Sequence, residues 1–316
     1  MKTSAGNGRR PLGVVLLAAL VIIDAVLIGA LLLNSRNGPA GEAGPIPTFT
    51  PLPDPTSTTS ETPSPSATGA VSSDAEAPVA FVAALSATQA WRATAGSCTA
   101  GSAVIEQTSD GGATWSPVDT TAFAPKTVLS LTVTDGTMSV LGGVGEDCTP
   151  QLWSASALAR SAMPPWTQVA RGADAVPYVT PGASTVKLSA GSADSPCTSP
   201  VRGLASGTTD VVACAAEFAT KTGSAGWVTV EAPGLIDLAL TDTGYLLAAS
   251  RVQNCDGVAI QSVNAPLTAR SFPSLVGCAP ATDLVAGGTV LATTGNAVWL
   301  TSNDKTLVSA DGGATW

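Results

Sequence analysis

The side chains that could do chemistry are few, because the chain contains no histidine. Ser-His-Asp and Cys-His nucleophile pairs, HExxH zinc sites and an imidazole base near neutral pH are therefore excluded. Acid–base or nucleophilic work by carboxylates, lysine and tyrosine remains open, as does anion binding by arginine. Beyond residue 78 the tyrosines are Tyr178 and Tyr245. The arginines of the same region are Arg92, Arg160, Arg171, Arg202, Arg251 and Arg270.

The cysteines are the second set of reactive side chains, and all six lie beyond residue 97. An even number of cysteines downstream of an apparent export segment favours disulfides in an oxidising compartment. No Cys-x-x-Cys pair occurs, and without histidine a zinc site would need four scattered thiolates. We therefore expect structural disulfides, no metal and no cofactor, with a redox-active pair as the alternative. The candidates are Cys98, Cys148, Cys197, Cys214, Cys255 and Cys278.

The charge of the chain argues against nucleic acid as a partner. Only 12% of the residues are charged, and the formal net charge is −9. A nucleic-acid-binding domain needs a basic patch or stripe, whereas a net negative field repels phosphates. We expect no nucleic-acid binding.

An apolar run near the N-terminus has the length of a membrane span. Leu12 to Leu33 covers 22 residues and contains no proline. About 20 apolar residues cross the ~30 Å hydrocarbon core, whereas the apolar region of a cleavable signal peptide has only ~7–15. Lys2, Arg9 and Arg10 precede the run and only Arg36 follows closely, so the positive-inside rule leaves the N-terminus in the cytoplasm. The sequence predicts a cytoplasmic segment at 1–11, a transmembrane signal-anchor helix at 12–33 and a single-pass cell-membrane protein whose C-terminal domain is extracytoplasmic.

Two alternatives concern this segment. Cleavage near Ala40 or Ala43 would release the chain from the membrane. Asp24, near the middle of the run, is either a pairing residue for a membrane partner or a protonated or snorkelling carboxyl tolerated by a strongly apolar helix.

Residues 34–77 change abruptly to Pro, Thr, Ser, Gly and Glu. Such a composition cannot bury enough apolar surface to fold, and its prolines keep the backbone extended. We expect a disordered extracytoplasmic linker, or stalk, that separates the membrane from a domain at 78–316.

The domain at 78–316 has the pattern of an all-β protein with an internal repeat. Short runs of Val, Leu, Ala and Thr are broken every eight to twelve residues or so by Gly, Asp and Pro, without a sustained helical period. The segment TSDGGATW at 108–115 recurs as SADGGATW at 309–316. The shared positions are Thr108, Asp110, Gly112, Thr114 and Trp115, and Ser309, Asp311, Gly313, Thr315 and Trp316.

These two segments resemble the Asp box (bacterial neuraminidase repeat) of the β-propeller superfamily that includes sialidases, sortilin-type receptors and photosystem assembly factors. The resemblance places each box at the turn between the third and fourth strands of a blade, on the face away from the active centre. An Asp followed by two glycines suits a tight hairpin in which the carboxylate accepts backbone N–H groups. The Trp is expected to open the fourth strand and to wedge between blades. The boxes are therefore structural.

Worn copies of the box lie between the two intact ones. They end at Trp166, Trp227 and Phe272, and the last has Phe in place of Trp. Paired β runs at 81–94, 129–143, 201–215, 235–250 and 282–302 are interpreted as the inner strands of blades roughly 45 residues apart. The stretch from Ala173 to Ser195 is a sixth, eroded blade or an excursion. The predicted fold is thus an all-β propeller of about five to six four-stranded blades.

The last blade stops at Trp316, where its fourth strand should begin. Propellers commonly close by taking a strand from the other end of the chain, which removes an exposed edge. The segment around Ala75 to Phe81 is the expected donor, and a truncated chain is the alternative.

The propeller layout places the cysteines mostly on the face opposite the boxes. Six cysteines allow 15 connectivities, which the sequence does not distinguish. The sequential pairing Cys98–Cys148, Cys197–Cys214 and Cys255–Cys278 is geometrically reasonable in that layout. The functional face of such propellers carries the loops between second and third strands. Its polar candidates for ligand binding are Glu146, Asp147, Arg251, Asn254 and Asp256.

The resemblance also implies a test for sialidase chemistry. That family uses three arginines on the substrate carboxylate, a Tyr nucleophile with a Glu partner, and an Asp acid/base. Its Phe/Tyr-Arg-Ile-Pro motif is absent, and Arg92 lies in a different context, Ala-Trp-Arg-Ala-Thr. We therefore expect no catalytic residues and a non-catalytic binding or scaffold module for an extracytoplasmic protein or glycan. A membrane-tethered exo-sialidase-like glycoside hydrolase is the alternative.

Overall fold

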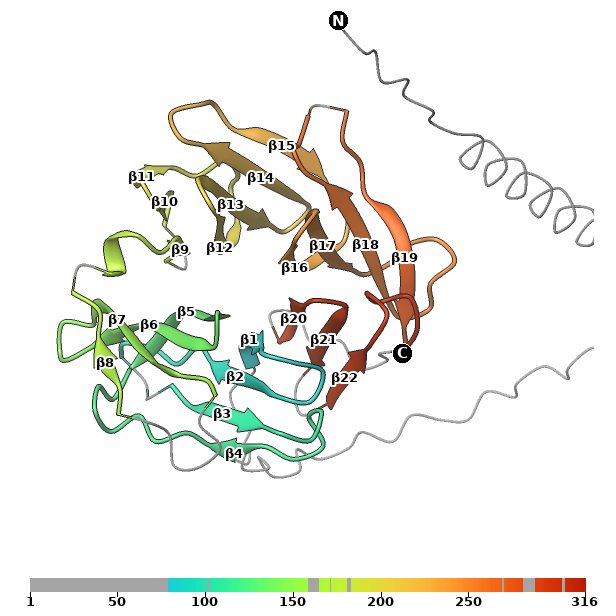
Figure 1. Cartoon of the computed structure of the whole chain (residues 1–316). Helices are drawn as coiled ribbons and strands as arrows, with labels where there is room; N and C mark the ends of the chain where they lie inside the picture. Colours follow the sequence, from blue (N-terminus) through green and yellow to red (C-terminus); the bar gives the residue numbers. More distant parts are fainter. Residues whose placement is uncertain are drawn as a thin grey trace, which may run out of the picture. The chain divides into compact units, whose positions relative to one another are not determined.

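Short strands separated by tight turns fold into six antiparallel sheets in the computed structural model of the chain (Figure 1). The structure describes residues 79–316 except 100, 102, 159–164, 171, 181–182, 269, 281–287 and 303–304. The predicted cytoplasmic segment, span and stalk lie outside these residues. No helix within the described part is long and apolar enough to cross a membrane.

Each sheet is one blade, and its strands are hydrogen-bonded in chain order. Blade 1 holds β1 (Val79–Ala84), β2 (Ala90–Thr94), β3 (Ile105–Thr108) and β4 (Ser116–Pro117). Blade 2 holds β5 (Thr127–Thr134), β6 (Thr137–Val144), β7 (Thr149–Ser156) and β8 (Thr167–Gln168), and a 3₁₀ turn η1 (Gly172–Asp174) follows. Blade 3 holds β9 (Tyr178–Val179), β10 (Thr185–Leu188) and β11 (Gly191–Asp194).

The second half of the ring is built in the same way. Blade 4 holds β12 (Pro200–Ser206), β13 (Thr209–Cys214), β14 (Glu217–Thr222) and β15 (Val228–Glu231). Blade 5 holds β16 (Leu235–Thr241), β17 (Gly244–Ala249), β18 (Val258–Asn264) and β19 (Ser274–Ala279). Blade 6 holds β20 (Thr289–Thr294), β21 (Ala297–Ser302) and β22 (Lys305–Ser309).

The innermost strands β1, β5, β9, β12, β16 and β20 close a ring (Figure 1). Each of them contacts the innermost strand of the next blade, and β20 contacts β1. The prediction of an all-β propeller is confirmed, with six blades, of which four have four strands and two have three. The stretch from Ala173 to Ser195 contains the short strands of blade 3, so it is the sixth, eroded blade.

The prediction of a strand donor around Ala75 to Phe81 is wrong for the part that the structure describes. Val79 to Phe81 belong to β1, which pairs with β2 as the innermost strand of blade 1. The apolar sequence of β1 explains this, because Val82, Ala83 and Ala84 are buried between two neighbouring blades. Among the described residues, no fourth strand pairs with β22.

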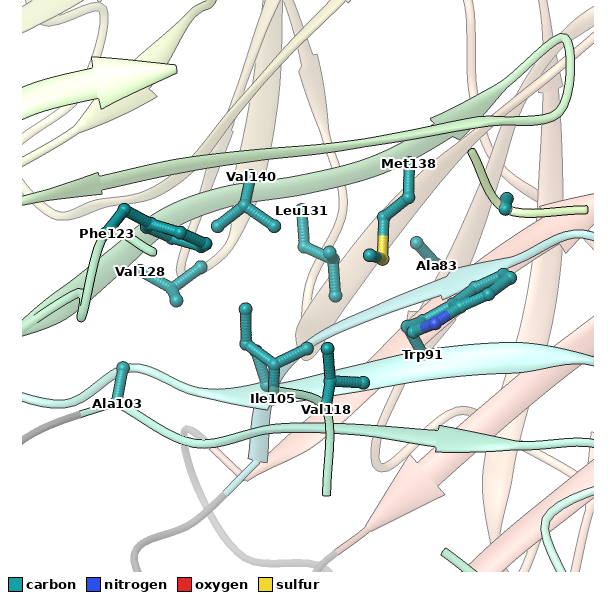
Figure 2. Packing of buried hydrophobic residues seen from close by; sticks show 12 residues of the cluster. Ala83, Trp91, Ala103, Ile105, Val118, Phe123, Val128, Leu131, Met138 and Val140 are labelled. Carbon is teal, nitrogen blue, oxygen red and sulfur yellow. The ribbon is translucent and has the colours of Figure 1, made fainter. Parts of the chain in front are cut away.

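The hydrophobic core consists of clusters between neighbouring blades. Between blades 1 and 2, Trp91 and Ile105 pack against Leu131, Met138 and other side chains of the facing blade (Figure 2). Similar clusters join blades 3 and 4, 4 and 5, 5 and 6, and 6 and 1. Within the described residues no such cluster joins blades 2 and 3.

Candidate functional site

The first Asp box forms the turn between β3 and β4. The Asp110 carboxylate accepts hydrogen bonds from the Thr114 N–H (3.0 Å) and from the hydroxyls of Thr108 (2.7 Å) and Thr114 (2.5 Å). These donors lower the pKa of Asp110 to about 2, with the Thr114 hydroxyl as the largest cause. The Thr108 hydroxyl in turn accepts a hydrogen bond from the Gly112 N–H (3.0 Å). The Asp110 carboxylate and the hydroxyls of Thr108 and Thr114 thus bond to one another inside the turn.

The second box repeats this geometry after β22. The Asp311 carboxylate accepts the Thr315 N–H (2.9 Å) and the hydroxyls of Ser309 and Thr315 (both 2.7 Å). These donors, led by the Thr315 N–H, lower the pKa of Asp311 to about 2. The Trp316 indole N–H donates to the carbonyl of Gly313 at 3.0 Å.

The last glycine of each box allows the turn to lie against the preceding blade. A Cβ at Gly112 (φ +87°) would stand 2.6 Å from Thr306 Cγ2 of β22, and one at Gly313 (φ +94°) would stand 2.8 Å from Ile260 Cγ2 of β18. The box of blade 1 therefore packs on blade 6, and that of blade 6 on blade 5. The boxes hold the ring together.

The worn boxes lie at equivalent turns, but their aromatic residues differ in how far they are buried. Trp227 is partly buried against the core between blades 3 and 4, with the Lys221 ammonium 5.8 Å from its ring. Trp166 packs edge-on against Phe123 at 4.9 Å. Phe272 is 76% exposed, so the substitution of Phe for Trp goes with the loss of the wedge in blade 5.

The sequential disulfide pairing is confirmed: Cys98–Cys148, Cys197–Cys214 and Cys255–Cys278. The first links the loop after β2 to the turn after β6, and therefore joins blades 1 and 2. The third ties the loop after β17 to β19 within blade 5. The second ties the segment before β12 to β13.

One described cluster has the composition of a metal site. Ligand atoms of Cys197, Cys214 and Glu217 lie within 4.8 Å of one another beside a hollow of about 380 Å³. The two sulfurs are bonded to each other, so neither is a thiolate ligand. The cluster in its disulfide form therefore offers a single carboxylate.

The five predicted binding residues occupy loops on the face opposite the boxes. Glu146 and Asp147 are exposed in the turn between β6 and β7. Arg251, Asn254 and Asp256 are exposed in the loop between β17 and β18, where Arg251 and Asn254 have positive φ. The structure brings each group together within its own loop and gives neither group a mutual hydrogen bond or ion pair. Ligand binding there stays a prediction.

A structural repeat inside the channel has no counterpart among the sequence motifs. In blades 1, 2, 4 and 5 the innermost strand has a register shift at the same place, which skips Ala80, Leu129, Val201 and Ile236. Such bulges re-aim the side chain that follows. The residues that follow are Phe81, Ser130, Arg202 and Asp237, which are equivalent positions of four blades.

Arg202 and Asp237 form a buried ion pair at this level of the channel. Arg202 Nη1 donates to Asp237 Oδ2 at 2.7 Å, and the two side chains are 9% and 4% exposed. Arg202 Nη2 also donates to the carbonyl of Ala80 (2.9 Å), and its guanidinium lies 5.3 Å from the centre of the Phe81 ring. The backbone N–H of Leu291 donates to Asp237 at 2.7 Å. One ion pair therefore ties together the innermost strands of blades 4, 5, 1 and 6.

The electrostatics of the Arg202–Asp237 ion pair are those of a pair with a structural role. Burial raises the pKa of Asp237, while Arg202 and backbone N–H groups oppose the shift by stabilising the carboxylate. The sequence signal for Asp237 is a lone charge within the apolar run LIDLAL, a pattern that predicts a buried and therefore paired group.

The channel holds a cavity of about 410 Å³ on one side of the Arg202–Asp237 ion pair. All its lining residues come from β1, β5, β12, β16 and β20, or from the turn after β16, and those of the four bulged strands lie C-terminal to the bulges. The C-terminal ends of these strands lead into the turns that contact the boxes: the Gly111 N–H donates to the Thr88 carbonyl (3.0 Å) and the Gly312 N–H to Asn296 (2.8 Å). The cavity therefore reaches the surface on the box face, away from the loops that carry the predicted binding residues.

The described arginines do not converge. Arg92, in β2, pairs with Glu106 at 2.7 Å and lies 4.6 Å from the Trp115 ring. Arg251 and Arg270 lie in loops at opposite ends of blade 5, and Arg202 alone lines the cavity. Arg160 and Arg171 lie outside the described residues.

Neither tyrosine is among the residues that line the cavity. Tyr245, in β17, packs against Phe218 at 5.3 Å in the core between blades 4 and 5. Tyr178 is in β9, which contributes no residue to the cavity lining. Burial raises the pKa of both hydroxyls, and Asp174 adds to the shift at Tyr178, so both are poorer nucleophiles than a free tyrosine.

Comparison with known proteins assigns no family to this chain. No protein-family profile matches the sequence. No curated protein matches it. A solved structure described as "YCF48 bound to D1 peptide" is similar, with 17% sequence identity over 76% of this chain and 80% of that chain and a TM-score of 0.29. A likeness at that level says nothing about a ligand of this chain.

Proposed function

We propose that the chain is a non-catalytic binding or scaffold module for a protein or glycan, with a body of the Asp-box propeller type. The observation that carries this proposal is the use of ionisable side chains at the channel. Arg202, at the channel, is paired with Asp237, and the box carboxylates Asp110 and Asp311 do not line the cavity and accept hydrogen bonds within their own turns. What is left at the centre is a cavity lined by hydroxyls, apolar side chains and strand backbone, with the carboxylate of Asp242 at its mouth. Such a cavity can bind a ligand, and its described lining holds no acid–base pair.

The sialidase-like alternative draws no support from the described side chains. Binding a substrate carboxylate requires several convergent arginines, and a tyrosine nucleophile needs a nearby base. Arg92 and Arg202 are each held in an ion pair in different blades, and Tyr245 lies in the core.

The two functions are separated by one assay. The purified chain is incubated with a fluorogenic sialoside and with a panel of fluorogenic neutral glycosides. The proposal expects no release of fluorophore above the blank. Turnover that is lost in Tyr178→Phe or Tyr245→Phe would establish the hydrolase instead.

The location of the module is part of the proposal. We infer that residues 12–33 anchor the chain in the cell membrane and that the stalk at 34–77 holds the propeller outside the cytoplasm. Three disulfides in the folded body support an oxidising compartment. Protease treatment of intact cells should degrade the propeller while sparing residues 1–11. N-terminal sequencing of the mature protein should find the original start, whereas a start near Ala40 or Ala43 would identify a cleaved signal peptide.

A further inference from the structure

The cavity begins beside the buried Arg202–Asp237 ion pair. Arg202 itself and Phe81 are among the lining residues, and the guanidinium lies 5.3 Å from the centre of the Phe81 ring. The outer end of the cavity is formed by Thr134, Ser206 and Asp242, all exposed at the C-terminal ends of their strands. A volume of about 410 Å³ lies within the range of small-ligand sites, which is roughly 300–1,000 Å³.

The wall is rich in groups that both donate and accept hydrogen bonds. Ser130, Thr132 and Thr134 alternate along β5 and point to the side opposite the core shared with blade 1. Because β9 of the next blade has only two residues, this row is not covered there, and Thr132 is exposed. Hydroxyls of Ser206 and Thr241 face the same cavity from blades 4 and 5.

The lining strands also present backbone groups. The innermost strands that line the cavity pair on one edge with β2, β6, β13, β17 and β21. Along the described residues of the lining, no strand pairs with their other edge. Some of these groups are used locally, as when the Thr293 hydroxyl donates to the Leu240 carbonyl. A ligand that fills the cavity must therefore replace water at both donors and acceptors.

The charge of the cavity selects among ligands. Arg202 is the only basic residue in the lining, and Asp237 neutralises it, so no described cation is free to hold a phosphate, carboxylate or sulfate. The carboxylate of Asp242 at the mouth repels anions further. An apolar ligand would leave hydroxyls and strand edges desolvated, which costs about 1–3 kcal/mol for each unsatisfied group.

We propose that this cavity binds an uncharged carbohydrate unit, which enters from the Asp-box face. Each sugar hydroxyl donates and accepts, as do the serine and threonine hydroxyls of the wall. The proposal rests on the binding function inferred above and adds the ligand class and the entrance. It places the ligand at the opposite end of the propeller from Glu146, Asp147, Arg251, Asn254 and Asp256.

The test uses the full chain in detergent on an array of neutral and anionic glycans, with dissociation constants then measured by calorimetry for the neutral glycans that bind. Thr132→Trp fills the uncovered side of the cavity and should abolish binding. Thr132→Val removes one hydroxyl at nearly constant shape and should weaken binding about 2- to 10-fold. Thr149→Trp, an exposed position at the start of β7 on the opposite face, is the matched control and should leave the affinity unchanged. Thermal unfolding checks that each variant is folded, and Ser206→Val replaces Thr132→Trp if the latter does not fold.

The outcomes separate this inference from the function on which it rests. No neutral glycan bound, only anionic glycans bound, or affinity lost in Thr149→Trp but kept in Thr132→Trp would each overturn the cavity site. A peptide or protein ligand that depends on the loops around Glu146 or Arg251, together with no neutral glycan bound, would overturn the cavity site while leaving the binding function intact.

Discussion

Replacing Asp237 by alanine is expected to be one of the most destabilising single changes in the propeller. Arg202 and Asp237 are 9% and 4% exposed and 2.7 Å apart, so the mutation leaves a buried guanidinium without its counter-charge. It also removes the acceptor of the Leu291 N–H. Removing one partner of a buried ion pair costs about 3–5 kcal/mol, because the remaining charge stays desolvated. The whole stability of a domain is only about 5–15 kcal/mol.

The magnitude is measured by urea unfolding with the disulfides intact. The double variant Arg202→Met/Asp237→Leu removes both charges and should be more stable than Asp237→Ala alone, since apolar residues of similar volume often replace such a pair without loss. It should still fall short of the wild type by about 1–3 kcal/mol if the Leu291 N–H finds no new partner. Asp174→Ala is the surface control: its pair with Lys187 spans 3.6 Å with the aspartate 78% exposed, and should contribute at most about 1 kcal/mol. The buried ion pair would be refuted by a loss of unfolding free energy under about 1 kcal/mol for Asp237→Ala. It would also be refuted by a double variant whose loss equals the sum of the losses for the two single substitutions.

Three further outcomes follow from the boxes and disulfides. The pKa of Asp311 is about 2 in the folded chain against an ordinary 3.8, so its stabilisation is complete above about pH 4 and is lost as pH falls through about 2. The difference in unfolding free energy between wild type and Asp311→Asn should therefore shrink over that window, and a constant difference would contradict this origin. Gly111→Ala meets no atom nearer than 3.8 Å and should cost about 1–2 kcal/mol for its positive φ, whereas Gly112→Ala adds a 2.6 Å clash with the last blade and should cost about 1–3 kcal/mol more. Equal urea midpoints for the two would be inconsistent with packing of the box on that blade. Replacing Cys98 and Cys148 by alanine opens a loop with a sequence separation of 50 and should lower stability by about 4 kcal/mol, measured by the same unfolding assay. A loss below about 1 kcal/mol would mean that blades 1 and 2 are held together by their core alone.

The architecture could be predicted because its signals are local. The boxes at 108–115 and 309–316 specify a turn through side-chain-to-backbone bonds between residues at most four positions apart, as the hydrogen bonds of Asp110 show. The paired apolar runs specify inner strands in the same local way. The sequence does not decide whether 173–195 is a blade, because the strands of blade 3 have only two to four residues, too few to establish a period.

The interior of the channel could not be predicted, because its contacts join distant positions. Arg202 reaches the carbonyl of Ala80 across 122 positions, and Asp237 reaches Leu291 across 54. A lone charge within an apolar strand indicates that a partner exists but not which residue it is. The bulges that aim these side chains have no residue signature in this chain, since the skipped residues Ala80, Leu129, Val201 and Ile236 are of four different types.

The prediction that the segment around Ala75 to Phe81 closes the last blade is wrong for a related reason. A propeller closed by a borrowed strand and one that begins with its own innermost strand both start with an apolar run, so the run before residue 84 fits either. The choice is made by pairing with β2 and by burial between two blades, as seen for Val82 to Ala84.

The entrance of the ligand is tested most directly by hydrogen–deuterium exchange of the chain with and without a neutral glycan identified on the array. A ligand that enters from the Asp-box face should slow exchange in peptides that cover 130–134, 202–206 and 238–242, and leave 145–149 and 250–257 unchanged. Protection confined to 145–149 and 250–257 would place the ligand on the opposite face and contradict the account.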